Sequence, residues 1–151
     1  GAMLDLGIYP LWLATWLLGP GTIENLDITP APSGVDDSVA MTMSHANNAK
    51  SKIHCSISQP WGGPATIIGS QGSVTVPSQF FCAEELTVTR HGETRTVACP
   101  MKGNGYAHEI AHVEACLAKG LTESSDLPHE LSVELATKMD AVIAATPSVA
   151  T

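Results

Sequence analysis

The sequence is poor in positive charge, in closely spaced cysteines and in long apolar runs. Seven Lys and Arg stand against fifteen Asp and Glu, which gives a net charge of −8 and leaves no basic stripe to neutralise phosphates. We therefore expect neither a nucleic acid nor a membrane as a partner. The longest apolar stretch, residues 11–18, contains Thr15 and is far shorter than the roughly 20 residues that span a bilayer. It is typical of a buried helix.

Cysteine spacing excludes two further classes of site. Cys55, Cys82, Cys99 and Cys116 are too far apart for the close pairs of zinc ribbons and redox motifs. Reduced thiols are expected, and because no secretory signal is visible, so is a cytoplasmic location. A chain of 151 residues, 44% of them hydrophobic, fits one globular unit, 1–151.

The order of local patterns predicts an α+β fold. Pro10 suits the first turn of a helix that ends at Gly19. Runs typical of strands follow at 22–29, 38–43, 52–57, 65–68, 73–76, 86–89 and 94–97. Short loops at 69–72 and 91–93 contain glycine and indicate hairpins. Two helices come last, so we expect a mostly antiparallel sheet of about six strands with helices packed on one face.

Two apolar patterns bear on packing. In the helix after Gly105, Tyr106, Ile110, Val113 and Leu117 form a stripe that we expect to face the core. The run 40–43 carries apolar residues at both parities, with methionines at 41 and 43, which favours a partner on the open face of the sheet.

The motif His108-Glu109-Ile110-Ala111-His112 matches the H-E-x-x-H pattern of zinc hydrolases. Two imidazoles one turn apart can share a metal, Glu109 could activate its water, and Glu130 or Glu134 could be a third ligand. However, the expected core stripe turns both histidines to the opposite, exposed side of the helix. We therefore expect no metal and keep the zinc hydrolase as an alternative.

Asp5 and Tyr9 are four residues apart, so in a helical turn their side chains share one face. A carboxylate beside a phenol can tune proton transfer. The same residues are also typical of a helix cap and of a core tyrosine, and both interpretations stay open at this point.

No dinucleotide fingerprint is present. The third glycine of G-x-G-x-x-G would fall at His108 after Gly103 and Gly105, and the glycines at 19 and 21 end a helix instead of joining a strand to one. We expect no bound cofactor in this chain alone.

Several segments together resemble a known family. GAMLDLGIYPL at 1–11, ATIIGSQGSV at 65–74, GYAHEI at 105–110 and CLAKG with LTES at 116–124 follow one another as in the C-terminal domain of the glucose-fructose oxidoreductase, inositol dehydrogenase and rhizopine catabolism (Gfo/Idh/MocA) family. With Tyr at position 9 the chain looks most like the sugar oxidoreductase and the dihydrodiol or xylose dehydrogenase-like members.

The resemblance implies the substrate-side domain of an NAD(P)-dependent oxidoreductase that acts on a sugar, a polyol or a related alcohol or carbonyl. It implies an N-terminal Rossmann domain, absent from 1–151, whose lysine works with Asp5 and Tyr9, and a homodimer formed through the sheet. A phenol beside a Lys⁺ can accept the proton of an alcohol that loses hydride, and the carboxylate can orient that lysine. A stand-alone binding or dimerisation module of the same fold is the other alternative.

Overall fold

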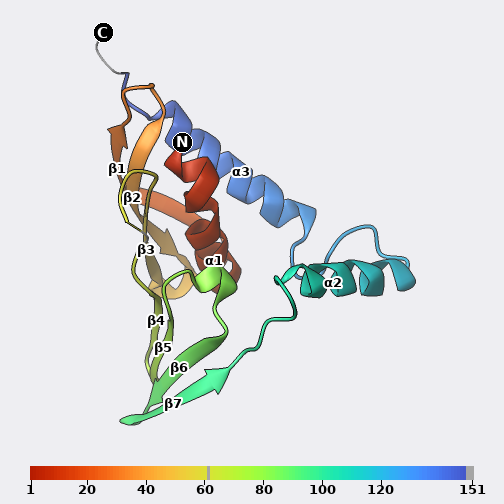
Figure 1. Cartoon of the computed structure of the whole chain (residues 1–151). Coiled ribbons are helices and arrows are strands. Elements are labelled where there is room, and N and C mark those ends of the chain that lie inside the picture. The colour runs from red at the N-terminus through yellow and green to blue at the C-terminus, as the bar shows by residue number, and fades with distance from the viewer. Residues whose placement is uncertain (61, 149–151) are drawn as a thin grey trace. The chain divides into compact units, whose positions relative to one another are not determined.

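The computed structural model describes residues 1–60 and 62–148, and its contacts divide the chain into two compact units (Figure 1). Unit 1 comprises Gly1–Pro60 and Leu127–Thr151, and unit 2 comprises Trp61–Asp126. The α+β class is confirmed. Instead of one sheet of about six strands, the described residues form seven strands in two antiparallel sheets, β1-β2-β3 and β4-β5-β6-β7.

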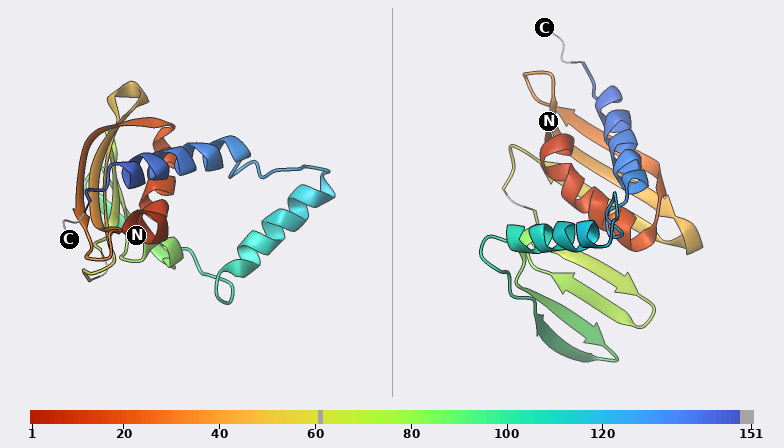
Figure 2. Two further views of the ribbon diagram at one scale, coloured as in Figure 1. Left: turned by 90° about the horizontal axis from the view of Figure 1, so that it is seen from above. Right: turned by 90° about the vertical axis from the view of Figure 1, so that its right-hand side faces the viewer.

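Unit 1 places two helices over one face of its sheet. The helical part of the N-terminus consists of a π-helical turn η1 (Met3–Gly7) and α1 (Ile8–Leu18), and the C-terminal helix is α3 (His129–Ala144). The strands are β1 (Gly21–Pro30), β2 (Asp36–His45) and β3 (Lys50–Ser56), with the 3-10 turn η2 (Ala46–Asn48) before β3. Figures 1 and 2 show α1 and α3 side by side over this sheet.

Alternation along β2 determines which side chains meet these helices. Val39, Met41 and Met43 are at most 3% exposed, whereas the even-numbered residues between them point to the opposite face. A register shift after Ile23 lets β1 contribute Ile23, Leu26 and Ile28 to the same core despite their uneven spacing. Burial of these apolar side chains against α1 and α3 is the main stabilising term of the unit.

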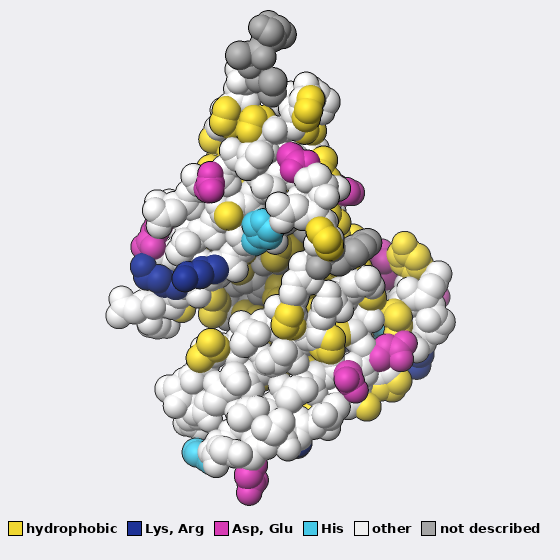
Figure 3. Space-filling model, turned by 60° about the vertical axis from the view of Figure 1, so that its left-hand side comes forward, with side chains coloured by type: hydrophobic (Ala, Val, Ile, Leu, Met, Phe, Trp, Pro, Cys, Tyr) yellow, Lys and Arg dark blue, Asp and Glu magenta, His cyan; other side chains and the backbone are white. Residues whose placement is uncertain are grey.

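The opposite face of this sheet is polar, which corrects one expectation. Met41 and Met43 share one parity and both lie under the helices, so they cannot form an apolar patch for a partner. The outer side chains are mostly small or charged: Thr22, Asn25, Asp27, Ser38, Ala40, Thr42, Lys52 and His54. In Figure 3, backbone and polar side chains cover most of the visible surface, with hydrophobic side chains scattered among them.

Unit 2 contains a four-stranded meander and one helix. Its strands are β4 (Ala65–Gly69), β5 (Gly72–Val76), β6 (Glu85–Arg90) and β7 (Glu93–Ala98), followed by α2 (Tyr106–Ala118); a 3-10 turn, η3 (Phe80–Cys82), precedes β6. Both expected hairpins are confirmed, since β4 pairs with β5 and β6 with β7. The register puts all apolar side chains except Ile68 and Ala98 on a single face of the sheet, namely Ala65, Ile67, Val74, Val76, Leu86, Val88 and Val97.

The α2 helix corrects a second expectation. Its apolar stripe is exposed: Tyr106 is 64% exposed, Ile110 57%, Val113 50% and Leu117 67%. The less exposed side carries His112 and Cys116 instead, because that side faces the loop that follows the helix. Within 62–126 no side chain is buried, so the amphipathic pattern of α2 is real but the cover that we expected is not supplied by the described part of this unit.

None of the helices in the described residues is both long and apolar enough to span a membrane. The stretch 11–18 belongs to α1, as expected, but only one of its sides is buried: Leu11 is fully buried whereas Trp16 is 52% exposed. The helix also begins earlier than Pro10 suggests, since η1 and α1 run without a break from Met3. Pro10 cannot donate a backbone hydrogen bond, and the wider π turn just before it is a place where the helical ladder shifts.

Candidate functional site

Asp5 and Tyr9 lie on the exposed side of the N-terminal helix. Asp5 is exposed and Tyr9 is 40% exposed, whereas Met3 and Leu11 on the other side are fully buried. A π turn advances more residues per turn than an α turn, so residues four apart across η1 remain on one side. The structure therefore brings the two predicted residues to one accessible helix face.

Apolar and aromatic side chains accompany this pair. Leu4 is 53% exposed, and Trp12 stacks on Trp16 with ring centroids 5.5 Å apart. A large exposed apolar surface around a carboxylate and a phenol is typical of a face that closes over a ligand or another domain. On the buried side, a Cβ on Gly7 would come within 2.6 Å of Met3 Sδ and 3.1 Å of Cys55 Sγ, so a larger residue there would have to displace these side chains.

Both ends of the helix are held by the two end residues of β2. At its beginning, the buried Asp36 carboxylate accepts a hydrogen bond of 2.5 Å from the Met3 backbone N–H. A carboxylate at a helix N-terminus satisfies a free donor and interacts favourably with the helix dipole. Burial raises the pKa of Cys55 to about 11, and the negative charge of the same Asp36 carboxylate contributes to the rise.

At the other end of the helix, His45 is 8% exposed and its Nδ1 lies 2.8 Å from the Gly19 carbonyl oxygen, while Nε2 lies 2.9 Å from Ser51 Oγ. A carbonyl can only accept, so Nδ1 carries the proton and donates it to Gly19. Asp36 and His45 thus fix the helix that carries Asp5 and Tyr9. The sequence pattern did not indicate them, although a charged residue and a histidine at the ends of an apolar strand are a usable signal.

The H-E-x-x-H residues do not converge on one point. His108 Nε2 accepts a hydrogen bond from the Lys102 backbone N–H at 3.2 Å, whereas His112 Nε2 lies 2.7 Å from Ser124 Oγ. Glu134, one of the candidate third ligands, forms an ion pair with Lys138 at 2.9 Å. Across the part of the chain that the structure describes, no three His, Cys, Asp or Glu side chains are placed to hold a metal ion. The geometry therefore gives no support to the zinc alternative.

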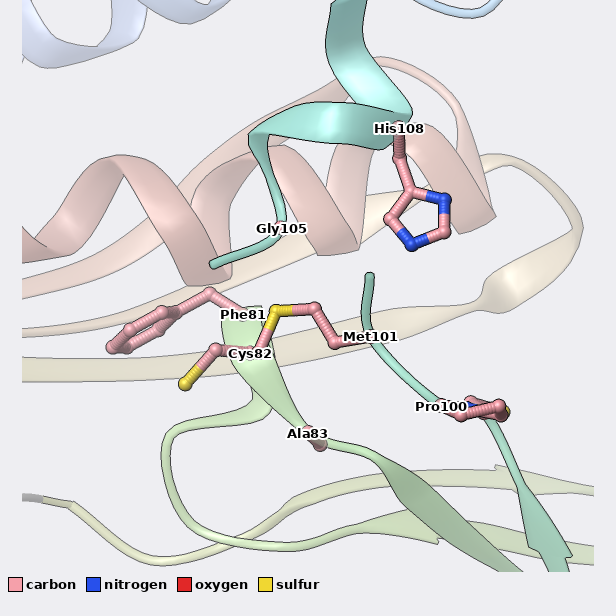
Figure 4. Close-up of a pocket in the computed structure, with 8 residues that line it drawn as sticks. Phe81, Cys82, Ala83, Pro100, Met101, Gly105 and His108 are labelled. Atoms are coloured by element: carbon pink, nitrogen blue, oxygen red, sulfur yellow. The ribbon is translucent and has the colours of Figure 1, made fainter. Parts of the chain in front are cut away.

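Two shallow hollows lie elsewhere. One, of about 490 Å³, is within unit 2, and Figure 4 shows His108 above it and Cys82 and Met101 along its wall. Its lining comprises Phe81, Cys82, Ala83, Cys99, Pro100, Met101, Gly105 and His108. The other, of about 580 Å³, lies on the outer face of β1–β3 between Asp27 and His54. Asp5 and Tyr9 line neither hollow.

The strand arrangement also bears on the cofactor. A dinucleotide cradle needs parallel strands joined through a glycine-rich turn and a helix. Every strand pair in residues 1–60 and 62–148 is antiparallel. The described residues therefore do not fit the phosphate-binding part of such a cofactor.

A family model matches the part of the chain that contains the segments 1–11 and 65–74. Residues 1–75 match the family model of the GFO/IDH/MocA C-terminal domain. The same relationship extends over the rest of the chain in the relatives described next. The chain belongs to the Gfo/Idh/MocA family.

The similar curated proteins are trans-1,2-dihydrobenzene-1,2-diol dehydrogenases. The Homo sapiens protein is 29% identical over 150 residues, which cover 94% of this chain and 45% of that protein. The Macaca fascicularis protein is 30% identical over 136 residues, 85% of this chain and 41% of its own length. The chain thus spans less than half the length of these relatives.

Solved structures share the fold. The aldose-aldose oxidoreductase of Caulobacter crescentus, complexed with glycerol, superposes with a TM-score of 0.80 at 17% identity and covers 97% of this chain and 45% of its own. A 3-ketoreductase from Actinomadura kijaniata, a lysine-to-alanine variant in complex with TDP-benzene and NADP, gives 0.76 at 18% identity over 94% of this chain and 46% of its own. At these identities the likeness is one of fold.

Proposed function

We propose that residues 1–151 form the substrate-side domain of an NAD(P)-dependent oxidoreductase that acts on a sugar, a polyol or a related alcohol or carbonyl. The observation that carries the proposal is the helix η1–α1, which presents Asp5 and Tyr9 together on an exposed apolar face while Asp36 and His45 fix its two ends. Catalytic groups act best on rigid elements, and this helix is pinned at both termini.

In the proposed reaction the hydroxyl proton of an alcohol passes to the Tyr9 phenol oxygen, or returns from it when a carbonyl is reduced. The nicotinamide supplies the hydride chemistry when it is bound. Asp5 holds the ammonium of a lysine from the cofactor domain, and that cation favours the ionised phenol. The exposed aromatic side chains beside the pair exclude water once the face is covered.

The cofactor is assigned to another domain, because the antiparallel sheets lack a strand-turn-helix cradle for its phosphates. NAD and NADP occur in solved structures of the same fold, in complexes of an Agrobacterium radiobacter oxidoreductase and of the A. kijaniata ketoreductase. Variants of that ketoreductase replace one lysine by alanine or glutamate and one tyrosine by phenylalanine. These are the two residue types that the proposal pairs.

The homodimer and the cytoplasmic location remain proposals. The methionines of β2 no longer support a dimer, since both lie in the core. What supports it is the family resemblance together with the half-exposed apolar face of β4–β7. In the alternative, a stand-alone binding or dimerisation module of the same fold, the same apolar face would form the interface, and Asp5 and Tyr9 would have no catalytic role.

The test is Tyr9→Phe in the parent enzyme that joins this chain to its cofactor domain. The ring is retained and the proton-transfer group is lost, so kcat should fall by roughly 10²–10⁴-fold while cofactor affinity changes little. Asp5→Asn should lower kcat as well, by misplacing the lysine, and should alter the pH profile.

Tyr106→Phe is the matched control, because Tyr106 is the other tyrosine of the chain and is 64% exposed on α2. Its kcat should equal that of the wild type. A correctly folded Tyr9→Phe enzyme with unchanged kcat would overturn the proposal and leave Tyr9 a structural residue.

A further inference from the structure

His112 is the centre of a polar cluster that the proposed function does not use. Its Nε2 lies 2.7 Å from Ser124 Oγ and 3.4 Å from Cys116 Sγ, and its Nδ1 lies 3.6 Å from Asp126 Oδ2. All four residues belong to α2 and the loop after it, within unit 2. The His112 side chain is 35% exposed and the Asp126 side chain 76%, so solvent reaches the cluster.

The order of these groups is that of an activated nucleophile. A nucleophile within hydrogen-bond reach of an imidazole, itself oriented by a third group, is the general arrangement for proton removal from a thiol or hydroxyl. Asp126 beside Nδ1 favours the tautomer that carries its proton there, which leaves Nε2 free to accept. The Asp126 backbone N–H donates to Ser124 Oγ at 3.0 Å, and this hydrogen bond helps to hold the loop beside the imidazole.

Two donors compete for Nε2, and they differ in acidity. A thiol loses its proton far more readily than an aliphatic hydroxyl does, so the same base that only orients Ser124 can ionise Cys116. The Cys116 side chain is half-buried and not enclosed.

We propose that Cys116 is a nucleophilic thiol for which His112 is the base, and that hydroperoxides oxidise it. The Cys116 proton passes to His112 Nε2, and the thiolate attacks one peroxide oxygen. The O–O bond breaks, an S–O bond forms, and the leaving hydroxide, or the alkoxide of an organic peroxide, takes the proton from the imidazolium. The products are a sulfenic acid and water, or an alcohol when the peroxide is organic.

Cys82 and Cys99 line the same hollow as His108, but their Sγ atoms pair with carbonyl oxygens, so they and the buried Cys55 act as internal references. Cys55 is 6% exposed, and burial raises its pKa to about 11. Cys99 is exposed, and its Sγ lies 3.9 Å from the Val97 carbonyl oxygen. Cys82 Sγ lies 3.4 Å from the Gln79 carbonyl oxygen. A carbonyl oxygen cannot take up a proton at neutral pH, so neither thiol is hydrogen-bonded to a base.

The charged groups near the pair come from α2 and from the loop after it, which also carries Glu123. Asp126 faces His112 from the loop, and His108 and Glu109 precede His112 by one turn of α2. Lys119 follows Cys116 by three residues, at the end of the helix.

The experiment measures alkylation of each cysteine by iodoacetamide in the full 151-residue chain, resolved by peptide mass spectrometry across a range of pH. Near neutral pH, Cys116 should react about tenfold or more faster than Cys99, because His112 Nε2 lies 3.4 Å from its Sγ and can take up its proton. After treatment with hydrogen peroxide, dimedone should label Cys116 ahead of Cys99 and should not label Cys55.

Three variants distinguish whether His112 acts as a base for Cys116 or only anchors the loop. His112→Gln keeps a polar side chain but cannot take up the proton, so the excess rate of Cys116 should vanish. His108→Gln, on the same helix, should leave it unchanged. Ser124→Ala removes the loop contact but retains the thiol and imidazole, so the excess rate should persist or rise.

Unchanged circular dichroism and unchanged alkylation of the buried Cys55 establish that each variant is folded. The proposal is overturned if Cys116 has the same pH profile as Cys99, or if its excess rate survives in a folded His112→Gln chain. Loss of the excess rate in Ser124→Ala but not in His112→Gln would likewise make the cluster a loop anchor only.

Discussion

The two units of the chain contain similar elements, yet their apolar side chains end in different surroundings. In unit 1 the strand β2 alternates, and helices cover its apolar parity, so Val39 and Met43 are fully buried. In unit 2 the strands β4–β7 also place most of their apolar side chains on one face, but this face is only half-buried and the α2 stripe is exposed. A regular pattern thus specifies a face to be covered, and in unit 2 the described residues do not provide the cover.

The difference extends to the two polar sites. Asp5 and Tyr9 lie in unit 1, on a helix whose two ends are hydrogen-bonded to residues of β2. Cys116 and His112 lie in unit 2, next to a loop held by side-chain hydrogen bonds. The first arrangement suits chemistry that needs fixed geometry, whereas the second suits a thiol that must be reached from solvent.

The largest expected effect comes from the same substitution in both units. Leu11→Ala on α1 removes a fully buried side chain and should lower the free energy of unfolding by about 2–5 kcal/mol. Leu117→Ala on α2 removes a side chain that is 67% exposed and should change it by no more than about 0.5 kcal/mol. Chemical denaturation followed by circular dichroism measures both. Equal losses would show that α2 is covered in solution and would end the contrast.

An intermediate effect is expected from the buried thiol of unit 1. The pKa of Cys55 is raised from 9.0 to about 11 by burial and then by Asp36, so folding favours the neutral thiol. The unfolded chain therefore ionises first, and the stabilisation is fully present below about pH 9 and is lost as the pH rises toward 11. The loss should be on the order of 1–3 kcal/mol by pH 11.

Cys55→Ala provides the control for this pH dependence, since it has no group that ionises at that position. Its stability, measured by denaturation at a series of pH values, should decline less steeply above pH 9 than that of the wild type. Parallel declines in the two proteins would mean that Cys55 ionises as readily in the folded chain as in the unfolded one.

Local patterns predicted the strands, because each strand needs only its own alternation and a turn residue at its end. The expected runs at 38–43 and 73–76 lie inside β2 and β5. The predicted start of the first helix was wrong. The helix begins near Met3, whose backbone N–H donates to Asp36, a residue 33 positions away in the sequence. No local signal reports such a contact, whereas Pro10 is a strong but here misleading signal for a helix start.

Burial was harder to predict than secondary structure. The parity of Met41 and Met43 was misjudged because alanine at position 40 looks apolar but lies on the polar face. The apolar stripe of α2 was expected to face the core, because amphipathic helices usually bury their apolar side. His112 was therefore expected on the exposed side, whereas its side chain is only 35% exposed. The pair Asp5 and Tyr9 was found from spacing and resemblance, and its catalytic role stays a prediction.

The smallest effect, and the last test of the contrast, concerns the turn between β6 and β7. His91 and Gly92 both have positive φ, 52° and 81°, as the two central residues of a tight hairpin do. Histidine tolerates this conformation better than most residues but less well than asparagine. His91→Asn should therefore stabilise the hairpin by only about 0.5 kcal/mol. Hydrogen exchange should then slow at the amides of β6 and β7 and stay the same at those of β1–β3, because a locally opening unit gains protection by itself. Gly92→Ala, strained at its φ of 81°, should speed exchange at the same amides and serves as the opposite control. If His91→Asn slows exchange equally in both sheets, the two units unfold together, and the difference in their burial has no counterpart in their stability.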